Sequence, residues 1–454
     1  MKRNDGLKML GALIASVLIS APTGFAQNGL SIQTARPIRL TVAPKASSAI
    51  TMKTIPQATC VLHAEGATDA EHQLKLFADD EGIVRFHVRP SAETGKAAHF
   101  QVDCAADGKI NTFPLHLRSS SLPTADMPPP PAEMEIKKVH PGASVRAALT
   151  NDEALNLGSD ELANRGYPLR PDQDKAPEAF GAWLKAVTKP ARFVAPRLVP
   201  RLEVTHSPRV TNAYETSNNW SGFELRGGNN YDWVMGEWYV PSVSYETNRH
   251  VYSAYWIGLD GDGTSDLVQA GTEQEITDIV FWGSHFDFTS YYGWTEFLPQ
   301  QPTEQVISNF TVNPGDLILT QVWVGNPGSS ASLAGAYGIF SVENVSRSEY
   351  TTIYTSRCNA SIWGICLVWT NVGGTEAEWI MERPTVNGAL PDLANYGTTY
   401  MYNSYAHISN AGPYFMNYDG ATYQQISMYN GSDLLSTTWP VTSSTMGFSW
   451  YNFH

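Results

Sequence analysis

The sequence predicts a mainly β protein whose C-terminal half is one large antiparallel β-sandwich. Aromatic residues make up 11% of the 454 residues, including 13 Trp and 21 Tyr, whereas charged residues make up only 16%. From residue 212 onward, Val, Ile, Tyr, Trp and Phe recur in runs with frequent period-two alternation, and no helix-length pattern occurs. Aromatic and β-branched residues in such runs are typical of strands that bury one face.

The predicted strands of residues 211–454 are Tyr231–Val240, His250–Leu259, Ile279–Phe297, Leu317–Val324 and Ala336–Val342. An Asn-Pro-Gly-Asp turn at residues 313–316 separates two of these runs. We expect two sheets packed face to face, with aromatic side chains of one sheet lining a concave face.

The first 26 residues have the features of an export signal. A basic start precedes an apolar run at residues 9–19, and small residues follow before Gln27. The run is too short to span a bilayer comfortably, although a retained membrane anchor is the alternative interpretation. We therefore expect a secreted, extracellular or periplasmic protein that has no membrane contact once the signal is removed.

The length of the chain implies two or three domains. Alternating runs at residues 27–120 predict a small β-sandwich, and four consecutive prolines within residues 121–135 predict a stiff linker. Four cysteines in an exported chain suggest disulfides, and although three connectivities are open, local spacing favours Cys60–Cys104 and Cys358–Cys366.

Residues 136–210 are the only part with a helical pattern. The run Pro177–Val187 places its bulky apolar residues on one face, and its proline suits the first turn of a helix. A basic, proline-punctuated stretch follows from Lys189 to Arg209, and we expect it to be extended and accessible to proteases.

Charge is distributed unevenly. Residues 211–454 contain 23 acidic residues, five Arg and no Lys, a net charge of −18, whereas the first 210 residues carry +4. Because carboxylates neutralise at low pH, a domain with few cations then has little charge repulsion to unfold it. The composition predicts a domain adapted to acid, with an ordinary acidic soluble protein as the alternative. It disfavours nucleic acid and anionic membranes as partners.

Several common catalytic motifs are absent. The sequence contains no GxSxG, no HExxH, no Asp-Thr-Gly or Asp-Ser-Gly triplet and no CxxC pair. The histidines are scattered without ligand spacing, so we interpret them as surface or polar core residues and expect no metal or other cofactor. The Asp-rich loop 260–266 lacks the Glu of an EF-hand at its twelfth position, where Gly271 stands. A different calcium loop and a tight strand connection both stay open.

Four strings in the C-terminal half carry a stronger signal. They are N-W-S-G at 219–222, W-I-G-L-D-G-D at 256–262 with L-V-Q-A-G-T-E at 267–273, Y-Y-G-W-T-E-F-L-P at 291–299, and E-A-E-W-I-M-E-R-P at 376–384. In content and order they resemble the strings of the glutamic peptidases, the eqolisin or scytalidoglutamic-peptidase type. The resemblance covers residues 218–384 well and the remainder weakly.

This resemblance implies an endopeptidase on a lectin-like, jelly-roll sandwich of two long, curved antiparallel sheets. Gln269 and Glu382 align with the catalytic pair. The residues that align with substrate-binding groups of the cleft are Trp256, Asp260, Glu273, Trp294 and Glu296. The sequence departs from the family pattern at Tyr292, where an acidic residue is expected, at Leu298, where an aromatic is expected, and at Glu273, which replaces Asp. These departures put subsite specificity and pH optimum in doubt.

The resemblance implies hydrolysis of polypeptides at acid pH without sensitivity to pepstatin, and the Glu–Gln pair suits such a reaction. A Glu can take a proton from water, and a Gln amide can donate to the developing oxyanion at any pH, which is typically worth ~3–4 kcal/mol. The strings at 165–168 and 175–180 look like pro-segments of bacterial members. We therefore expect residues 136–210 to be a pro-segment of a proenzyme that is a monomer.

We hypothesise that the basic end of this pro-segment lies across the acidic cleft as an intramolecular inhibitor, and that self-cleavage before about Thr211 follows as cleft carboxylates protonate. Two other functions stay open on a concave, aromatic-rich sandwich. One is a glycoside hydrolase, for which Glu376, Glu378 and Glu382 alternate suitably. The other is a non-catalytic carbohydrate-binding module.

Overall fold

The structure is a computed structural model that describes most of the chain from residue 33 onward. The described residues are 33–34, 38–42, 48–66, 73–90, 97–119, 145–158, 161–162, 165–213, 215–226, 231–244, 249–281, 284–324, 337–356, 358–362, 365–370, 372–408 and 423–454. The expected export signal (1–26), the proline-rich linker (121–135) and the side chains of Cys358 and Cys366 lie outside them.

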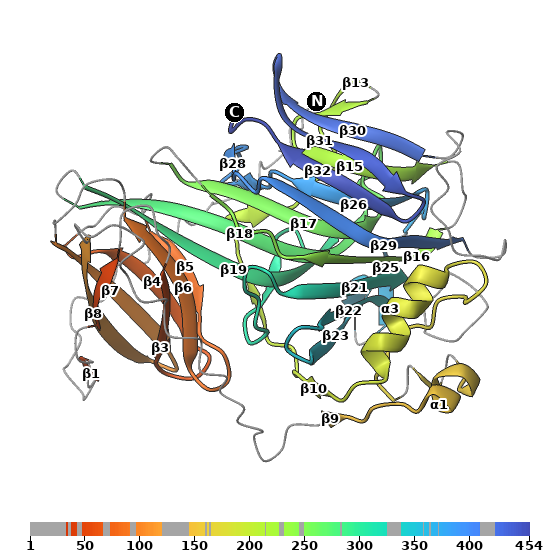
Figure 1. Ribbon diagram of the computed structural model, residues 1–454, viewed down its shortest axis with the longest axis horizontal. Helices are drawn as coiled ribbons and strands as arrows, with labels where there is room; N and C mark the ends of the chain where they lie inside the picture. Colours follow the sequence, from red (N-terminus) through yellow and green to blue (C-terminus); the bar gives the residue numbers. More distant parts are fainter. Residues whose placement is uncertain are drawn as a thin grey trace, which may run out of the picture.

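Two antiparallel sheets packed face to face form the C-terminal half (Figure 1), which confirms the predicted sandwich. The first sheet has the order β30-β15-β26-β17-β18-β19. Its strands are β15 (Trp220–Arg226), β17 (Val251–Leu259), β18 (Leu267–Phe281), β19 (Ser284–Leu298), β26 (Glu376–Glu382) and β30 (Tyr423–Asn430).

The second sheet has the order β31-β32-β29-β16-β21-β22-β23. Its strands are β16 (Tyr231–Tyr239), β21 (Leu317–Val324), β22 (Tyr337–Asn344), β23 (Glu349–Ser356), β29 (Thr398–Ile408), β31 (Asp433–Thr442) and β32 (Thr445–Trp450). Because β30 pairs with β15 on one side and β31 on the other, the two sheets are continuous along one edge.

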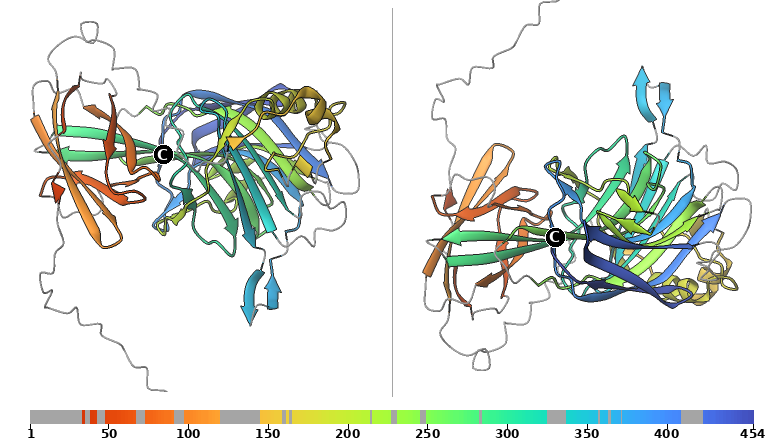
Figure 2. Two further views of the ribbon diagram at one scale, coloured as in Figure 1. Left: turned by 90° about the horizontal axis from the view of Figure 1, so that it is seen from below. Right: turned by 90° about the horizontal axis from the view of Figure 1, so that it is seen from above.

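Shorter strands border the two sheets. They are β9 (Val145–Arg146), β10 (Ala191–Phe193), β11 (Leu198–Pro200), β12 (Val204–Thr205), β13 (Thr211–Ala213), β14 (Thr216–Ser217), β20 (Gln305–Ile307), β27 (Thr385–Val386) and β28 (Asp392–Leu393). The hairpin of β24 (Cys358–Ile362) and β25 (Ile365–Trp369) projects from the sandwich (Figure 2).

The first sheet is buried on both faces, unlike a sheet with one solvated face. On β17, Tyr255 and Ile257 belong to the core between the two sheets, whereas Ala254 and Trp256 belong to a separate apolar cluster on the outer face. The strand is therefore continuously buried although its side chains alternate between faces. The outer face is where the motif residues gather.

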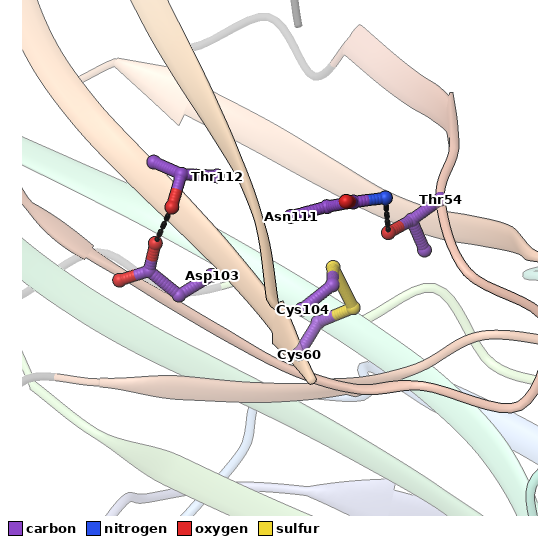
Figure 3. The surroundings of a disulfide bond; sticks show 6 residues. All are labelled: Thr54, Cys60, Asp103, Cys104, Asn111 and Thr112. Carbon is purple, nitrogen blue, oxygen red and sulfur yellow. Dashed lines mark hydrogen bonds between the residues drawn. A yellow bond between two sulfur atoms is a disulfide. The ribbon is translucent and has the colours of Figure 1, made fainter. Parts of the chain in front are cut away.

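The N-terminal part contains a six-stranded sheet, which is one of the two layers of the predicted small β-sandwich. Its strands are β1 (Gln33–Thr34), β2 (Ile38–Val42), β4 (Thr59–Ala64), β5 (Leu74–Phe77), β7 (Ala97–Ala106) and β8 (Lys109–Ser119). The predicted disulfide Cys60–Cys104 is confirmed and joins the neighbouring strands β4 and β7 (Figure 3).

The opposing sheet of this N-terminal sandwich is completed by the C-terminal half. The hairpin of β3 (Ser48–Lys53) and β6 (Ile83–Pro90) pairs with β19, so the long β18–β19 hairpin extends into the N-terminal sandwich (Figure 1). Phe288 of β19 lies with its ring centroid 4.8 Å from that of Phe100 and 6.3 Å from that of Phe86. The two parts consequently share one hydrophobic core. The exact domain boundaries stay a prediction.

Two of the helices within residues 145–210 are described over their full length. Helix α1 (Asn151–Asn156) begins with a capping box of Thr150 and Glu153, and α3 (Pro177–Val187) has its proline in the first turn. The buried face of α3 packs on α1 and on the outer face of the second sheet, as the apolar pattern predicted. Among the described helices, none has the length and apolar character needed to cross a membrane.

Candidate active site

The outer face of the first sheet brings most of the motif residues together. Strand pairing places Gln269 directly opposite Glu296, and places Glu382 opposite both Trp220 and Ala254. Directly paired residues and residues two apart share a face of a sheet. The motif residues on this face are therefore Trp256, Gln269, Glu273, Trp294, Glu296 and Glu382.

Glycines on the same face make room for the large side chains. A Cβ on Gly271 would lie 2.5 Å from the Cβ of Trp256 and 2.4 Å from the carbonyl oxygen of Tyr255. A Cβ on Gly258 would lie 2.9 Å from the Trp256 ring. Both positions must therefore lack a side chain for Trp256 to lie across the sheet.

The side chains of Glu382 and Gln269 are fully buried and both contact His206. Glu382 Oε2 accepts a hydrogen bond from Trp256 Nε1 at 2.8 Å and lies 3.0 Å from His206 Nδ1. Gln269 Nε2 donates to the backbone carbonyl oxygen of His206 at 2.9 Å and to Glu296 Oε2 at 3.0 Å. Neither Gln269 Oε1 nor Glu382 Oε1 has a hydrogen-bond partner among the described residues.

Residues Glu203–Val210, which we call the covering segment, hold His206 in this position. Val204 and Thr205 form β12, which pairs antiparallel with β27, and β27 begins three residues after Glu382. The backbone N–H of His206 donates to Glu296 Oε2 at 3.0 Å. Further along, Asn219 Nδ2 donates to the carbonyl oxygens of Ser207 and Pro208 at 3.2 and 3.3 Å. The covering segment thus runs extended over the outer face of the first sheet.

The imidazole of His206 is fully buried between an aromatic ring and carboxylates. It stacks on Trp294 with ring centroids 3.5 Å apart and planes inclined by 6°. Its Nε2 lies 3.1 Å from Glu304 Oε2 and 3.7 Å from Glu273 Oε2. Burial lowers the pKa of His206, but the surrounding carboxylates outweigh that effect and the pKa stands well above its usual value.

Arg201, just before the covering segment, occupies a second buried position. Its Nη1 donates to Glu275 Oε2 at 2.8 Å and to the hydroxyl of Tyr292, and its Nε lies 3.6 Å from Glu304 Oε1. Burial raises the pKa of Glu275, but Arg201 and His250 reverse this effect and lower the pKa to about 2. Tyr292, where the family pattern has an acidic residue, thereby binds a cation through its hydroxyl.

Arg209 forms a third contact of the same kind. Its Nη1 lies 2.7 Å from Asp262 Oδ2 and 3.6 Å from Glu224 Oε2. Glu224 faces Glu378 across paired strands, and burial raises the pKa of both carboxyls. Three cationic side chains of residues 201–209 are thus inserted among carboxylates of the C-terminal half.

Burial also raises the pKa of the motif carboxyls. The pKa of Glu296 and that of Glu273 stand well above the usual value, chiefly because neither side chain has contact with solvent. The neighbouring Glu304 raises the pKa of Glu273 further. The pKa of Glu382 is raised by burial and held down by the adjacent His206. Such carboxyls can carry protons at a pH where exposed carboxyls are ionised.

Asp260 is the one predicted site residue that lies apart from His206. Its carboxylate accepts hydrogen bonds from the backbone N–H groups of Gly374 and Thr375 at 2.7 and 2.6 Å, which fixes the loop before β26. In the same loop as Asp260, Asp262 pairs with Arg209 and Arg226, and Asp266 accepts from the backbone of Gly373. These contacts favour the tight strand connection over a calcium loop.

One group of described residues could hold a metal ion. His206 Nε2 and the carboxylates of Glu273 and Glu304 each offer a ligand atom, and these atoms lie within 4.8 Å of one another. A protonated imidazole between two carboxylates would make the same contacts as those described for these three residues. An ion pair therefore explains the arrangement without a metal.

The expectation that the stretch Lys189–Arg209 is accessible to proteases is wrong for most of its second half. Arg201, Val204 and His206 are buried, although Leu202 between them is 79% exposed. Sequence reasoning also missed His206, Arg201 and Glu304, because none of them belongs to a motif. The basic character of the stretch Lys189–Arg209 was the one feature of the sequence that indicated contacts with the acidic domain.

The chain is similar to known peptidases. A family model described as the Peptidase A4 family matches residues 218–450. The solved structures that match include Scytalido-glutamic peptidase with a peptide-based transition state analog, at 20% identity, 52% coverage of this chain, 98% coverage of that chain and a TM-score of 0.36. They also include SCP-B, a member of the eqolisin family of peptidases, with the tripeptide Ala-Ile-His, at 17% identity, 52% and 98% coverage and a TM-score of 0.33. No curated protein sequence matches the chain.

The match over more than half of the chain defines the class of protein: a glutamic peptidase on a β-sandwich. The chain belongs to the Peptidase A4 family, the eqolisins, as the four strings predicted. Membership of a peptidase family favours the peptidase interpretation over the glycoside hydrolase and the carbohydrate-binding module.

Proposed function

We propose that the protein is a secreted acid endopeptidase made as a proenzyme, with Glu382 and Gln269 as its catalytic residues. One observation carries this proposal. The carbonyl oxygen of His206 accepts a hydrogen bond from Gln269 at 2.9 Å, and Glu382 contacts the same residue. A peptide carbonyl therefore lies against a fixed amide donor, and a buried carboxyl contacts the side chain of the same residue, which brings together the two groups that peptide hydrolysis needs.

The reaction follows from these positions. Glu382 Oε1 and Gln269 Oε1 have no hydrogen-bond partner among the described residues and are available to accept hydrogen bonds from water. Glu382 takes a proton as the water oxygen attacks the carbonyl carbon, and Gln269 Nε2 donates to the oxyanion. Glu382 then returns the proton to the leaving amine nitrogen as the C–N bond breaks. The amide does not titrate, so its donor is present throughout the acid range.

The other motif residues hold the substrate or the pair. Trp256 fixes Glu382 through its indole N–H, and Glu296 accepts from both Gln269 and the substrate backbone. Trp294 and Glu273 face the side chain of the residue whose carbonyl is attacked. Asp260 acts through the loop that leads into the catalytic strand β26. We propose no metal or cofactor in this reaction.

An acid pH optimum has two physical reasons. The pKa of Glu296 is raised well above its usual value by burial, so a protonated carboxyl stands beside Gln269 at acid pH while Glu382 takes the proton from water. The domain that carries them has no Lys and only five Arg, so little positive charge accumulates when its carboxylates neutralise. Export of the protein, proposed from residues 1–26, is compatible with work in an acidic medium.

We further propose that residues 136–210 inhibit the enzyme within the same chain. The covering segment occupies the face on which a substrate would bind, and Arg201, His206 and Arg209 each enter a group of carboxylates. While this segment stays in place, no other polypeptide can reach Gln269 and Glu382, both of which are fully buried. Its removal creates the active, monomeric enzyme.

Digestion of denatured casein from pH 2 to 7 tests the proposed function. Matured wild-type enzyme should degrade casein at acid pH in the presence of pepstatin and of a metal chelator. Glu382→Gln should abolish this activity, and Gln269→Ala should reduce it by about 100-fold or more, as expected for loss of an oxyanion donor. Full activity in either variant would remove that residue from catalysis, and loss of activity with the chelator would contradict a reaction without metal.

A further inference from the structure

The backbone contacts of the covering segment define which peptide bond faces the catalytic pair. Among the carbonyl oxygens described for the covering segment, that of His206 is the one that accepts a hydrogen bond from Gln269. The preceding carbonyl oxygens of Glu203 and Val204 accept from the backbone N–H groups of Asn387 and Glu304. The following carbonyl oxygens, of Ser207 and Pro208, accept from Asn219. The register is therefore set on both sides of the His206–Ser207 bond.

The side chain that precedes this bond enters a pocket suited to a planar cation. Trp294 provides a flat surface for stacking at 3.5 Å. Glu304 and Glu382 lie 3.1 and 3.0 Å from the two ring nitrogens, one on each side of the ring. A protonated imidazole donates through both nitrogens and satisfies both acceptors, which no neutral aromatic side chain can do.

From these contacts we propose, on the basis of the proposed function, that the enzyme prefers substrates with histidine immediately before the scissile bond. The same geometry assigns His206–Ser207 as the first bond that the precursor cleaves in itself. This places the maturation site four residues before the sequence-based expectation at about Thr211.

The chemistry at this bond is an ordinary hydrolysis. Water adds its oxygen to the carbonyl carbon of His206, and its protons pass through Glu382 and to the departing nitrogen of Ser207. The products are a pro-segment that ends in the carboxylate of His206 and a mature chain that begins with the amine of Ser207. The imidazole occupies Glu382 Oε2 and leaves Oε1, which has no partner among the described residues, to contact the water.

The pocket also explains why other side chains fit less well. A Phe in place of histidine can stack on Trp294 but leaves Glu304 and Glu382 without donors in a buried site. A Lys carries the charge but cannot stack as a plane or reach both carboxylates at once. Loss of a hydrogen bond to a charged group typically costs ~1.5–3 kcal/mol, which corresponds to a decrease in kcat/KM of at least tenfold.

A set of quenched peptides with the sequence of residues 203–210 tests the preference. Matured enzyme should cleave the parent peptide after its histidine, and kcat/KM should fall at least tenfold when this histidine is replaced by Phe, Lys or Leu. A peptide in which the residues corresponding to Val204 and His206 are exchanged is the matched control, because its composition is unchanged. In enzyme carrying Glu304→Gln, the ratio of kcat/KM for the His peptide to that for the Phe peptide should decrease.

The maturation site is tested on the full-length precursor at pH 3 to 4. The earliest products, identified by mass spectrometry and N-terminal sequencing, should end at His206 and begin at Ser207. A first cut at any other bond, or equal cleavage of the His and Leu peptides, overturns this inference. If either result is obtained while casein digestion still depends on Glu382, the inference fails and the proposed function stands. Absence of any casein digestion would overturn the proposed function itself.

Discussion

Replacing Arg201 with Gln should make the precursor activate at higher pH. Arg201 is fully buried and donates to Glu275 Oε2 at 2.8 Å, and with His250 it lowers the pKa of Glu275 from 4.5 to about 2. At 1.36 kcal/mol for each pKa unit, this pairing stabilises the docked pro-segment by at most about 3.4 kcal/mol. Part of this free energy comes from His250, so the corresponding change of about 300-fold in the docking equilibrium is an upper limit.

The sign of the pH dependence follows from the lowered pKa. A carboxyl whose pKa is depressed in the docked state contributes stability above its free pKa near 4.5, and this contribution is lost as the pH falls towards 2. The wild-type precursor should therefore lose this part of its inhibition only below about pH 4.5. The Arg201→Gln precursor lacks the contribution at every pH and should already convert above pH 4.5.

Conversion is followed by gel electrophoresis of both precursors over time from pH 2 to 7. Arg197→Gln is the matched control, because this arginine lies four residues earlier and forms no ion pair with a described residue. Since cleavage after His206 removes residue 201, the mature enzymes should have the same kcat/KM. An Arg201→Gln precursor whose conversion profile coincides with that of wild type would refute the reasoning.

The remaining predictions concern the architecture of the site and of the N-terminal sandwich. Gly271→Ala should destabilise the protein by about 1–3 kcal/mol and lower casein activity, because its Cβ would lie 2.5 Å from that of Trp256. Gly181→Ala in α3, where a Cβ meets nothing within 4 Å, should instead add about 1 kcal/mol in thermal unfolding, and equal melting of the two variants would contradict this. Replacing Cys60 and Cys104 with Ser should lower the free energy of unfolding by about 4 kcal/mol, because the disulfide closes a loop of 44 residues. An unchanged melting temperature under oxidising conditions would show that the disulfide does not stabilise the fold.

The fold and the motif residues were accessible from the sequence because their signals are local. Period-two alternation indicates a strand wherever it occurs, and the strings around Gln269 and Glu382 are each shorter than ten residues. Alternation within E-A-E-W-I-M-E at 376–382 also places Glu378 and Glu382 on one face without knowledge of the neighbouring strands. The family, the sandwich and the pairing of Cys60 with Cys104 followed from such signals and are confirmed.

The shared core of the two halves was not predictable from the same signals. Residues 27–120 have the pattern of a small sandwich, but nothing in them shows that Phe100 packs against Phe288 of a strand 188 positions further along. Period two defines which side chains point to the same face and not which partner covers that face.

The β-sandwich, the strings of a glutamic peptidase, the acidic domain and the basic segment before it can all be recognised without coordinates. The position of His206 cannot: its ring stacks on Trp294 and contacts Glu382, and its carbonyl oxygen accepts from Gln269, because of how the chain folds. A histidine between Thr205 and Ser207 has no local pattern that marks it. Its role comes from contacts with residues 63 to 176 positions away, which strand register and chain path bring together.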